Sequence, residues 1–347
     1  MINNQLKIGN RKVWMHKAIK NVDFGSESVL SNDPWLFVSL WLKREKKEKA
    51  LAFWNQARRF HEASLLMSIE AAPLAAYYCL LNATKTLLLV RSSNHKDIHG
   101  VSGDRAEKAK AYLGVEKIKF GTTGVLPALC GYLGESSVNT EYSLKDLLWN
   151  LPFVHRAFRH TYSSAAELFI PIQNACYIKH SNSSEAWFQA SVVPRYCDDR
   201  ILRHIPKSFE YFGKNDEISI RRKKRFDWVN GKHTRSKQDQ AIRNLISYHS
   251  SIRRLIVPIT GNSDLWYLKK NLKENPVAER HSLTIIFAAM HRLSELSRYD
   301  PNGLERHLNG NSNWLLTEFI QLAPSQFIDQ ISSEITGLQF WKPGYRS

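Results

Sequence analysis

Polar and ionisable side chains interrupt an otherwise apolar stretch, AAYYCLLNATKTLLLVRSSNHKDIHG, which runs from Ala75 to Gly100. A tyrosine, an asparagine and a lysine recur there at spacings of four and three residues, which places them on one face of a helix. An ammonium group in such a helix needs a carboxylate, a carbonyl oxygen or an anionic ligand beside it. An arginine and two histidines follow on a loop. The six residues are Tyr78, Asn82, Lys85, Arg91, His95 and His99.

Two interpretations of these six residues remain open. Together they could hold a phosphate group, with Gly100 letting the backbone approach the ligand closely. They could equally form a polar network that fixes the packing of the helix. A zinc site is disfavoured, because HKDIH lacks the glutamate of a metal-binding HExxH helix.

A basic run, IRRKKRFDW, forms a second candidate site. Basic side chains beside aromatic rings suit contact with phosphates and stacking on bases. An edge strand protected from aggregation by its charge would show the same pattern. The candidate nucleic-acid-binding residues are Arg221, Arg222, Lys223, Lys224, Arg225 and Trp228.

The overall charge also favours a polyanionic partner. Lys and Arg outnumber Asp and Glu by 49 to 32, a formal charge of +17. Such an excess is typical of proteins that bind nucleic acid or nucleotides. P-loop, dinucleotide-binding and GxSxG motifs are absent from the sequence, so neither a cofactor nor a metal is expected.

Four widely spaced cysteines and the lack of a signal peptide predict a cytoplasmic protein. No apolar run reaches the length of a membrane span, so no membrane partner is expected. The composition, 43% hydrophobic and 23% charged, is that of a soluble folded chain.

The order of patterns predicts an α+β fold, mostly α, in which both ends of the chain build a helical bundle around a small antiparallel β insertion. Asn32 or Asp33 should cap a helix that has Pro34 in its first turn, and Ser143 with Asp146 should approximate a capping box. The expected parts are an N-terminal arm at 1–30, a helical part at 31–166, a β-rich insertion at 167–230 and a C-terminal helical part at 236–347 that completes the bundle.

Several segments in a fixed order resemble the YaaC-like proteins. PLAAYYCLLNATKTLLL followed by HGVS is similar to their paired-tyrosine helix and His-Gly loop. DLLWNLPFVHRAF, LSELSRYDPNGLERHL and LLTEFIQLAPSQFID are similar to later segments of the same family. The resemblance spans most of residues 50–340 and implies a fold more than an activity.

A second likeness is to HEPN domains, helical bundles that often act as metal-independent RNases or partner nucleotidyltransferases. Catalytic members carry an arginine, often an asparagine, and then a histidine, and RNLISYH has that form. The likeness implies Arg243, Asn244 and His249 as catalytic residues, with the histidine moving protons and the arginine stabilising an anionic phosphorane.

These observations predict a cytoplasmic protein that binds nucleic acid or a nucleotide, as an effector or accessory component of a bacterial defence or toxin-like system. One alternative is a HEPN-like RNase, and another is a non-catalytic scaffold that partners a second protein. Oligomerisation is compatible with each of them.

Overall fold

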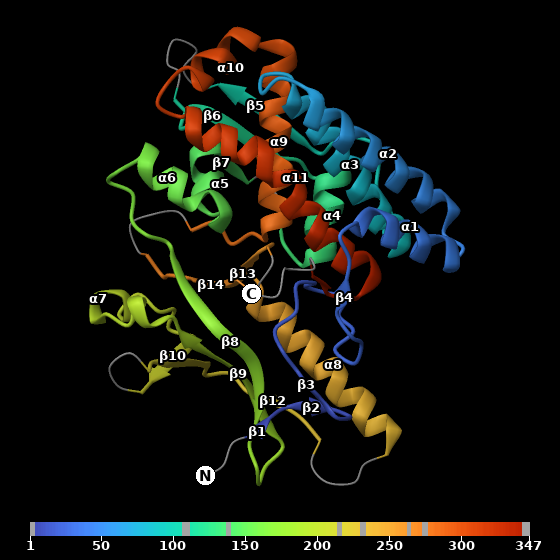
Figure 1. Ribbon diagram of the computed structural model, residues 1–347, viewed down its shortest axis with the longest axis vertical. Coiled ribbons are helices and arrows are strands. Elements are labelled where there is room, and N and C mark those ends of the chain that lie inside the picture. Colours follow the sequence, from blue (N-terminus) through green and yellow to red (C-terminus); the bar gives the residue numbers. More distant parts are fainter. Residues whose placement is uncertain are drawn as a thin grey trace. The chain divides into compact units, whose positions relative to one another are not determined.

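The computed structural model describes residues 4–105, 112–136, 140–213, 217–229, 234–261, 265–272 and 277–341 (Figure 1). Its eleven described helices and several antiparallel sheets make an α+β fold with a helical majority. The chain divides into two compact units. Unit 1 comprises Met1–Leu30, Leu168–Asn275 and Gly337–Ser347, and unit 2 comprises Ser31–Glu167 and Pro276–Thr336.

Unit 2 is mainly helical. Helix α3 contacts α2, α4, α9 and α11, so it is the central element of this unit. A small sheet in the order β5-β6-β7 belongs to the same unit. The elements are α1 (Pro34–Arg44), α2 (Glu48–Leu66), α3 (Ala72–Val90), β5 (Val101–Arg105), β6 (Glu116–Phe120), α4 (Val125–Leu133), β7 (Glu141–Ser143), α5 (Leu144–Trp149), α6 (His155–Thr161), α9 (Ser282–Tyr299), α10 (Pro301–Leu308) and α11 (Asn313–Thr336).

Unit 1 is built on an antiparallel sheet in the order β10-β11-β9-β8-β14-β13, onto which β1 and β12 also pair. Helix α8 packs on this sheet through its apolar face, which contributes Ala241, Leu245 and Ile252 to the core. The elements are β1 (Asn4–Gln5), β2 (Lys7–Ile8), β3 (Arg11–Lys12), β4 (Val29–Leu30), β8 (Phe169–Lys179), β9 (Glu185–Val192), α7 (Asp199–Leu202), β10 (Phe209–Phe212), β11 (Ser219–Arg222), β12 (Phe226–Asp227), α8 (Arg235–Ile252), β13 (Ile256–Ile259), β14 (Leu265–Lys269) and β15 (Phe340–Trp341).

The predicted helix starts are confirmed. Asp33 caps α1 by accepting a hydrogen bond from the Leu36 amide at 3.1 Å, and Pro34 is the first residue of that helix. Ser143 and Asp146 form the capping box of α5. Residues 115–141, which resemble a Gly- and Thr-rich loop, instead contain β6 and α4. The segment DRAEKAKAYLG at 104–114 has the pattern of a short helix, but it falls partly outside the described residues, and Asp104 itself belongs to β5.

Helix α8 and strands β13 and β14 belong to unit 1, so this part of the C-terminal segment packs with the sheet. The sequence from 240 to 256 has a helical pattern, but helix α8 ends at Ile252, because Ile256 begins β13, which pairs with β14. A short apolar run such as this is compatible with either a helix or a strand.

Among the described residues, α3 alone is long and apolar enough to cross a membrane. Of its apolar window, 72% is buried within the structure, as in the core helix of a soluble protein. Its polar side chains are accommodated locally. Thr84 donates to the Leu80 carbonyl at 2.8 Å and Asn82 donates to the Tyr78 carbonyl at 2.8 Å, so neither leaves a buried polar group unsatisfied.

A buried carboxylate connects the sheet of unit 2 to its helices. Glu116 on β6 is fully buried and accepts hydrogen bonds from Arg105 Nε at 2.7 Å, Arg292 Nη2 at 2.8 Å and His307 Nε2 at 2.8 Å. Burial alone would raise the pKa of Glu116, but these three hydrogen bonds and the charge of Arg292 lower it to about 2. The carboxylate is therefore ionised at neutral pH, although it has no contact with water.

We expect Glu116→Gln to destabilise unit 2 by about 3–5 kcal/mol, because it removes the fully buried carboxylate charge that Arg105 and Arg292 share and leaves them only the more exposed Asp300 and Glu295. Urea unfolding at neutral pH measures the effect. Glu141→Gln serves as a control, since Glu141 pairs with Lys119 at 3.7 Å on the surface, and its loss should cost less than about 1 kcal/mol. Equal effects of the two substitutions would contradict a special role for Glu116.

Two glycines, Gly100 and Gly124, let the loop that contains His99 cross the start of α4. Gly124 has a φ of +120°, and a Cβ there would lie 2.6 Å from the Ile98 carbonyl oxygen and 2.8 Å from Gly100 Cα. The crossing is held by hydrogen bonds from the Val125 and Leu126 amides to the carbonyls of Ile98 and His99, at 2.9 and 3.1 Å.

Gly124→Ala should therefore destabilise unit 2 by about 2–4 kcal/mol, because the clashing atoms are backbone atoms that cannot turn away. Gly131→Ala in the same helix is the matched control. Nothing lies within 4 Å of its added Cβ, so we expect it to be neutral or to stabilise by up to about 1 kcal/mol. Thermal unfolding followed by circular dichroism measures both variants, and a neutral Gly124→Ala would show that the crossing can relax.

Candidate functional site

The polar face of α3 is occupied by intramolecular contacts. Tyr78 stacks on Phe60 with ring centroids 5.3 Å apart, while Asn82 is 5% exposed and bonded to its own helix. Lys85 Nζ lies 2.9 Å from Asp97 Oδ1 and 5.3 Å from the ring centre of Phe53. The carboxylate that a buried ammonium requires is thus supplied by the loop, which favours a packing role for this face.

The remaining residues of this group also bond within unit 2. Arg91 Nη2 donates to the carbonyls of Glu334 and Ile335 at 2.8 and 2.6 Å, at the end of α11. His95 Nδ1 lies 3.2 Å from the Ser93 carbonyl. The structure therefore does not gather the six predicted residues around one cavity.

His99 contacts two aromatic rings that the helical spacing of Tyr78, Asn82 and Lys85 did not predict. Its ring centroid is 5.3 Å from that of Tyr77 and 5.5 Å from that of His291 on α9. Burial, His99 and two arginines lower the pKa of His291 to about 3, so its imidazole is neutral at physiological pH. Tyr77, the neighbour of the predicted Tyr78, thus lies at this junction, because it points into the core.

The predicted catalytic residues on α8 do not share a surface. His249 is fully buried: its Nδ1 accepts a hydrogen bond from the Tyr177 hydroxyl at 2.6 Å, and its Nε2 donates to the Ala18 carbonyl at 2.7 Å. Arg243 is exposed and donates to Gln240 at 2.8 Å, and Asn244 donates to the Asp227 carbonyl at 3.2 Å. With both nitrogens in use and no access to solvent, His249 has a structural role in this arrangement.

The basic run of 221–225 is only partly available to a ligand. Arg221 pairs with Glu210 at 2.7 Å, and the guanidinium groups of Arg222 and Arg225 cover the rings of Tyr248 and Trp187. Trp228 is buried, so it cannot stack on a base. Lys223 and Lys224 are exposed. Strand β11 pairs on both sides, with β10 and β9, and is therefore not an edge strand.

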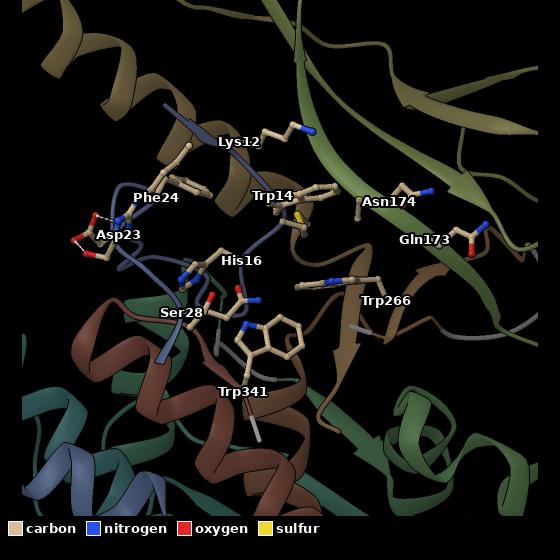
Figure 2. Close-up of a pocket in the computed structure, with 15 residues that line it drawn as sticks. Lys12, Trp14, His16, Asp23, Phe24, Ser28, Gln173, Asn174, Trp266 and Trp341 are labelled. Carbon is tan, nitrogen blue, oxygen red and sulfur yellow. Dashed lines mark hydrogen bonds between the residues drawn. The ribbon is translucent and has the colours of Figure 1, made fainter. Parts of the chain in front are cut away.

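Unit 1 contains an aromatic cleft of about 530 Å³ (Figure 2), a volume typical of small-molecule sites. The N-terminal segment, the bulged part of β8, strand β14 and the segment around β15 each contribute to its wall. Three tryptophans, from three of these segments, distinguish its lining. The residues used below are Arg11, Lys12, Trp14, His16, Gln173, Asn174, Trp266 and Trp341.

The indole rings are held by contacts with their own unit. Figure 2 shows Trp14, Trp266 and Trp341 following one another along the cleft. The buried Lys17 ammonium lies 4.8 Å from the ring centre of Trp341, and the buried Arg253 guanidinium lies 5.0 Å from that of Trp266. Such cation–π contacts fix the rings in place and bring positive charge close to the cleft.

The electrostatic effect of these cations is visible at His16. Burial and the charges of Arg253 and Lys17 lower the pKa of His16 to about 3, so its ring is neutral at physiological pH. Nδ1 accepts a hydrogen bond from the Ala18 amide at 3.0 Å. The proton of the neutral ring is therefore on Nε2, which makes this edge of His16 a hydrogen-bond donor.

A second cleft, of about 510 Å³ in unit 2, includes Arg105, Arg292 and three carboxylates. Both arginines already pair with Glu116, and they also reach Asp300 and Glu295 at 2.7 and 3.0 Å. Its charges are thus balanced internally. No group of three or more metal-ligating side chains with suitable geometry occurs in the described parts of the chain.

A comparison of the sequence with models of known protein families shows which family the chain belongs to. A model of the YaaC-like protein family matches residues 28–335. The chain belongs to the YaaC-like family. The comparisons show no likeness to HEPN domains, and no curated protein and no solved structure matches the chain. Trp14, His16 and Trp341 lie outside the matched range, so membership by itself carries no information about these walls of the cleft.

Sequence reasoning missed the cleft because its residues are far apart in the chain and carry no motif. Trp14 and Trp341 stand near opposite ends of the sequence, and Trp266 lies in an apolar run that resembles core. The only local signal is KVWMH at 12–16, in which an aromatic ring and an imidazole flank a methionine beside basic residues.

The two buried neutral histidines of unit 1 predict a pH-dependent stability. The pKa values of His16 and His249 lie below the ordinary value of 6.5 because burial and Arg253 disfavour the charged rings. The unfolded chain therefore binds more protons below pH 6.5, and stability should fall as the pH falls, by up to about 1.4 kcal/mol per pH unit for each histidine.

Urea unfolding between about pH 7.5 and pH 5 measures this slope. His16→Asn should reduce it, because an asparagine oxygen can still accept the Ala18 hydrogen bond but does not titrate. His180→Asn is the control: His180 accepts a similar hydrogen bond from the Asn182 amide at the surface, and its loss should leave the slope unchanged. Identical slopes in both variants would contradict the assignment to His16.

Proposed function

We propose that the aromatic cleft of unit 1 binds single-stranded nucleic acid, with a nucleotide as its smallest ligand. The observation that carries this proposal is the convergence of Trp14, Trp266 and Trp341 on one cleft beside the exposed Lys12. Aromatic rings that stack on bases, next to basic groups that contact phosphates, are the two features that single-strand binding needs.

The aromatic contribution depends on how accessible each ring is. Trp14 is 46% exposed, Trp341 is partly exposed and Trp266 is 3% exposed. A base can therefore stack on Trp14 and Trp341, whereas Trp266 forms the floor. Stacking tolerates any base, because every base has a π face, so this contact supplies affinity and little selectivity.

The electrostatic contribution comes from several sources. Lys12 is exposed at the cleft, and the buried Lys17 and Arg253 add positive potential from behind it. Lys223 and Lys224 offer further exposed cations in the same unit. The formal charge of +17 increases the attraction for a polyanion at long range.

The scaffold alternative rests on a different surface. Exposed apolar side chains occur on the α1–α2 hairpin of unit 2, at Leu36, Leu40, Leu65, Leu66 and Met67. A protein partner would cover such side chains, and their burial would be insensitive to salt. The RNase alternative has no comparable support, because His249 has no nitrogen available to a substrate.

Fluorescence anisotropy with labelled RNA and DNA of about twelve nucleotides tests the proposal. We expect the logarithm of the binding constant to fall with the logarithm of salt concentration, by about 0.7 for each phosphate contacted. Trp14→Ala should weaken binding by about 5- to 150-fold, which corresponds to the loss of one stacked base.

Trp314→Ala is the matched control, since Trp314 is also 46% exposed but lies on α11 in unit 2. It should leave the affinity unchanged. Unmodified nucleotides added as competitors show whether one base suffices. Binding that is absent at low salt, or that both tryptophan variants weaken equally, would overturn the proposal.

A further inference from the structure

A β-bulge places two carboxamide side chains next to each other in the wall of the aromatic cleft. On β8, Gln173 pairs with Ser191 of β9, and Cys176 pairs with Gln189, so β8 has one extra residue between these pairs. Ile172 and Ala175 consequently both point into the core of unit 1. Gln173 and Asn174, which lie between them, are both exposed and both line the cleft, whereas neighbours on a regular strand point to opposite faces.

Asn174 adopts a backbone conformation that most residues avoid. Its φ of +54° lies in the left-handed region, where asparagine is tolerated better than most other side chains. Glycine would satisfy the backbone without strain, but it would remove the amide from the cleft. A strained residue beside a cleft is a reason to look for a functional role of its side chain.

Among the residues that the structure describes, the side chains of Gln173 and Asn174 have no hydrogen-bond partner. Both side chains belong to the lining of the cleft, and Figure 2 shows them on β8, to one side of Trp14 and Trp266. Two NH2 groups and two carbonyl oxygens are therefore available beside the stacking surface.

We propose that Gln173 and Asn174 read the base that occupies the aromatic cleft and favour adenine. This inference rests on the proposed function. A carboxamide offers one acceptor and one donor side by side, which complements the N6 donor and N7 acceptor of adenine. The corresponding edge of guanine presents two acceptors, which a single carboxamide cannot pair with bidentately because one of its two polar atoms is itself an acceptor. An arginine would supply two donors, but Arg11 already donates to the Gly25 carbonyl at 3.0 Å and pairs with Glu27.

Competition between mononucleotides tests the selectivity. AMP, GMP, CMP and UMP are each titrated against a labelled oligouridine RNA bound to the full chain. We expect AMP to compete about tenfold more strongly than GMP, the discrimination that one well-formed bidentate contact provides. Asn174→Gly and Gln173→Ala, alone and combined, should bring this ratio close to one.

The glycine variant is suited to the test, because glycine adopts the same φ without strain and the fold should be retained. Affinity for the oligouridine should change less than about threefold, since stacking supplies it. Asn182→Gly, an exposed asparagine outside the cleft in the same unit, is the matched control and should keep the preference.

The outcomes separate the two proposals. If the wild-type protein binds no oligonucleotide, the proposed function falls and this inference falls with it. If it binds but all four nucleotides compete equally, the proposed function stands and the base-reading role is overturned. A preference for AMP that survives in the combined variant also overturns the role, because the selectivity then comes from other groups.

Discussion

The buried carboxylate of Glu116 is the interaction on which unit 2 depends. It lies on β6 and receives hydrogen bonds from β5, α9 and α10, so segments from the first and last thirds of the chain meet at one charge. A lone carboxylate would be protonated or expelled from such a site, and without it the two buried guanidinium groups would lose the partner that they share. The elements are therefore stable in this arrangement only together.

Unit 1 is joined in a different way, by hydrogen bonds from buried side chains to backbone carbonyls. His249 and Arg253 on and just after α8 donate to Ala18 and Lys17, and Lys17 in turn donates to Phe340. These contacts fix the N-terminal segment and β15 against α8 and the sheet without an ion pair at the centre. The aromatic cleft is a result of that arrangement, because its walls are the segments that these hydrogen bonds connect.

Local features were predictable from the sequence, whereas long-range ones were not. The cap at Asp33 and the capping box at Ser143 follow from short motifs, and the antiparallel strands within 167–230 follow from residue type. Strands β13 and β14 were not predictable, because a buried strand and a buried helix segment share the same apolar pattern. The order of segments identified the family correctly, and the match covers residues 28–335.

The candidate site was the least predictable part. Spacing on a helix correctly placed Tyr78, Asn82 and Lys85 on one face, but no spacing rule shows that Asp97 would neutralise Lys85. The same limit applies to His249, whose sequence context fits a nuclease and whose burial depends on Tyr177 and Ala18. Three tryptophans that meet only after folding leave no pattern in the chain.

The parallel pairing of β15 with β4 has a consequence for the timing of assembly. Phe340 and Trp341 pair with Val29 and Leu30, so a wall of the aromatic cleft is added by one of the last described segments to be synthesised. During translation, the N-terminal segment leaves the ribosome long before its partner strand exists. The cleft is consequently incomplete on a nascent chain until Trp341 has left the ribosome and β15 has paired with β4.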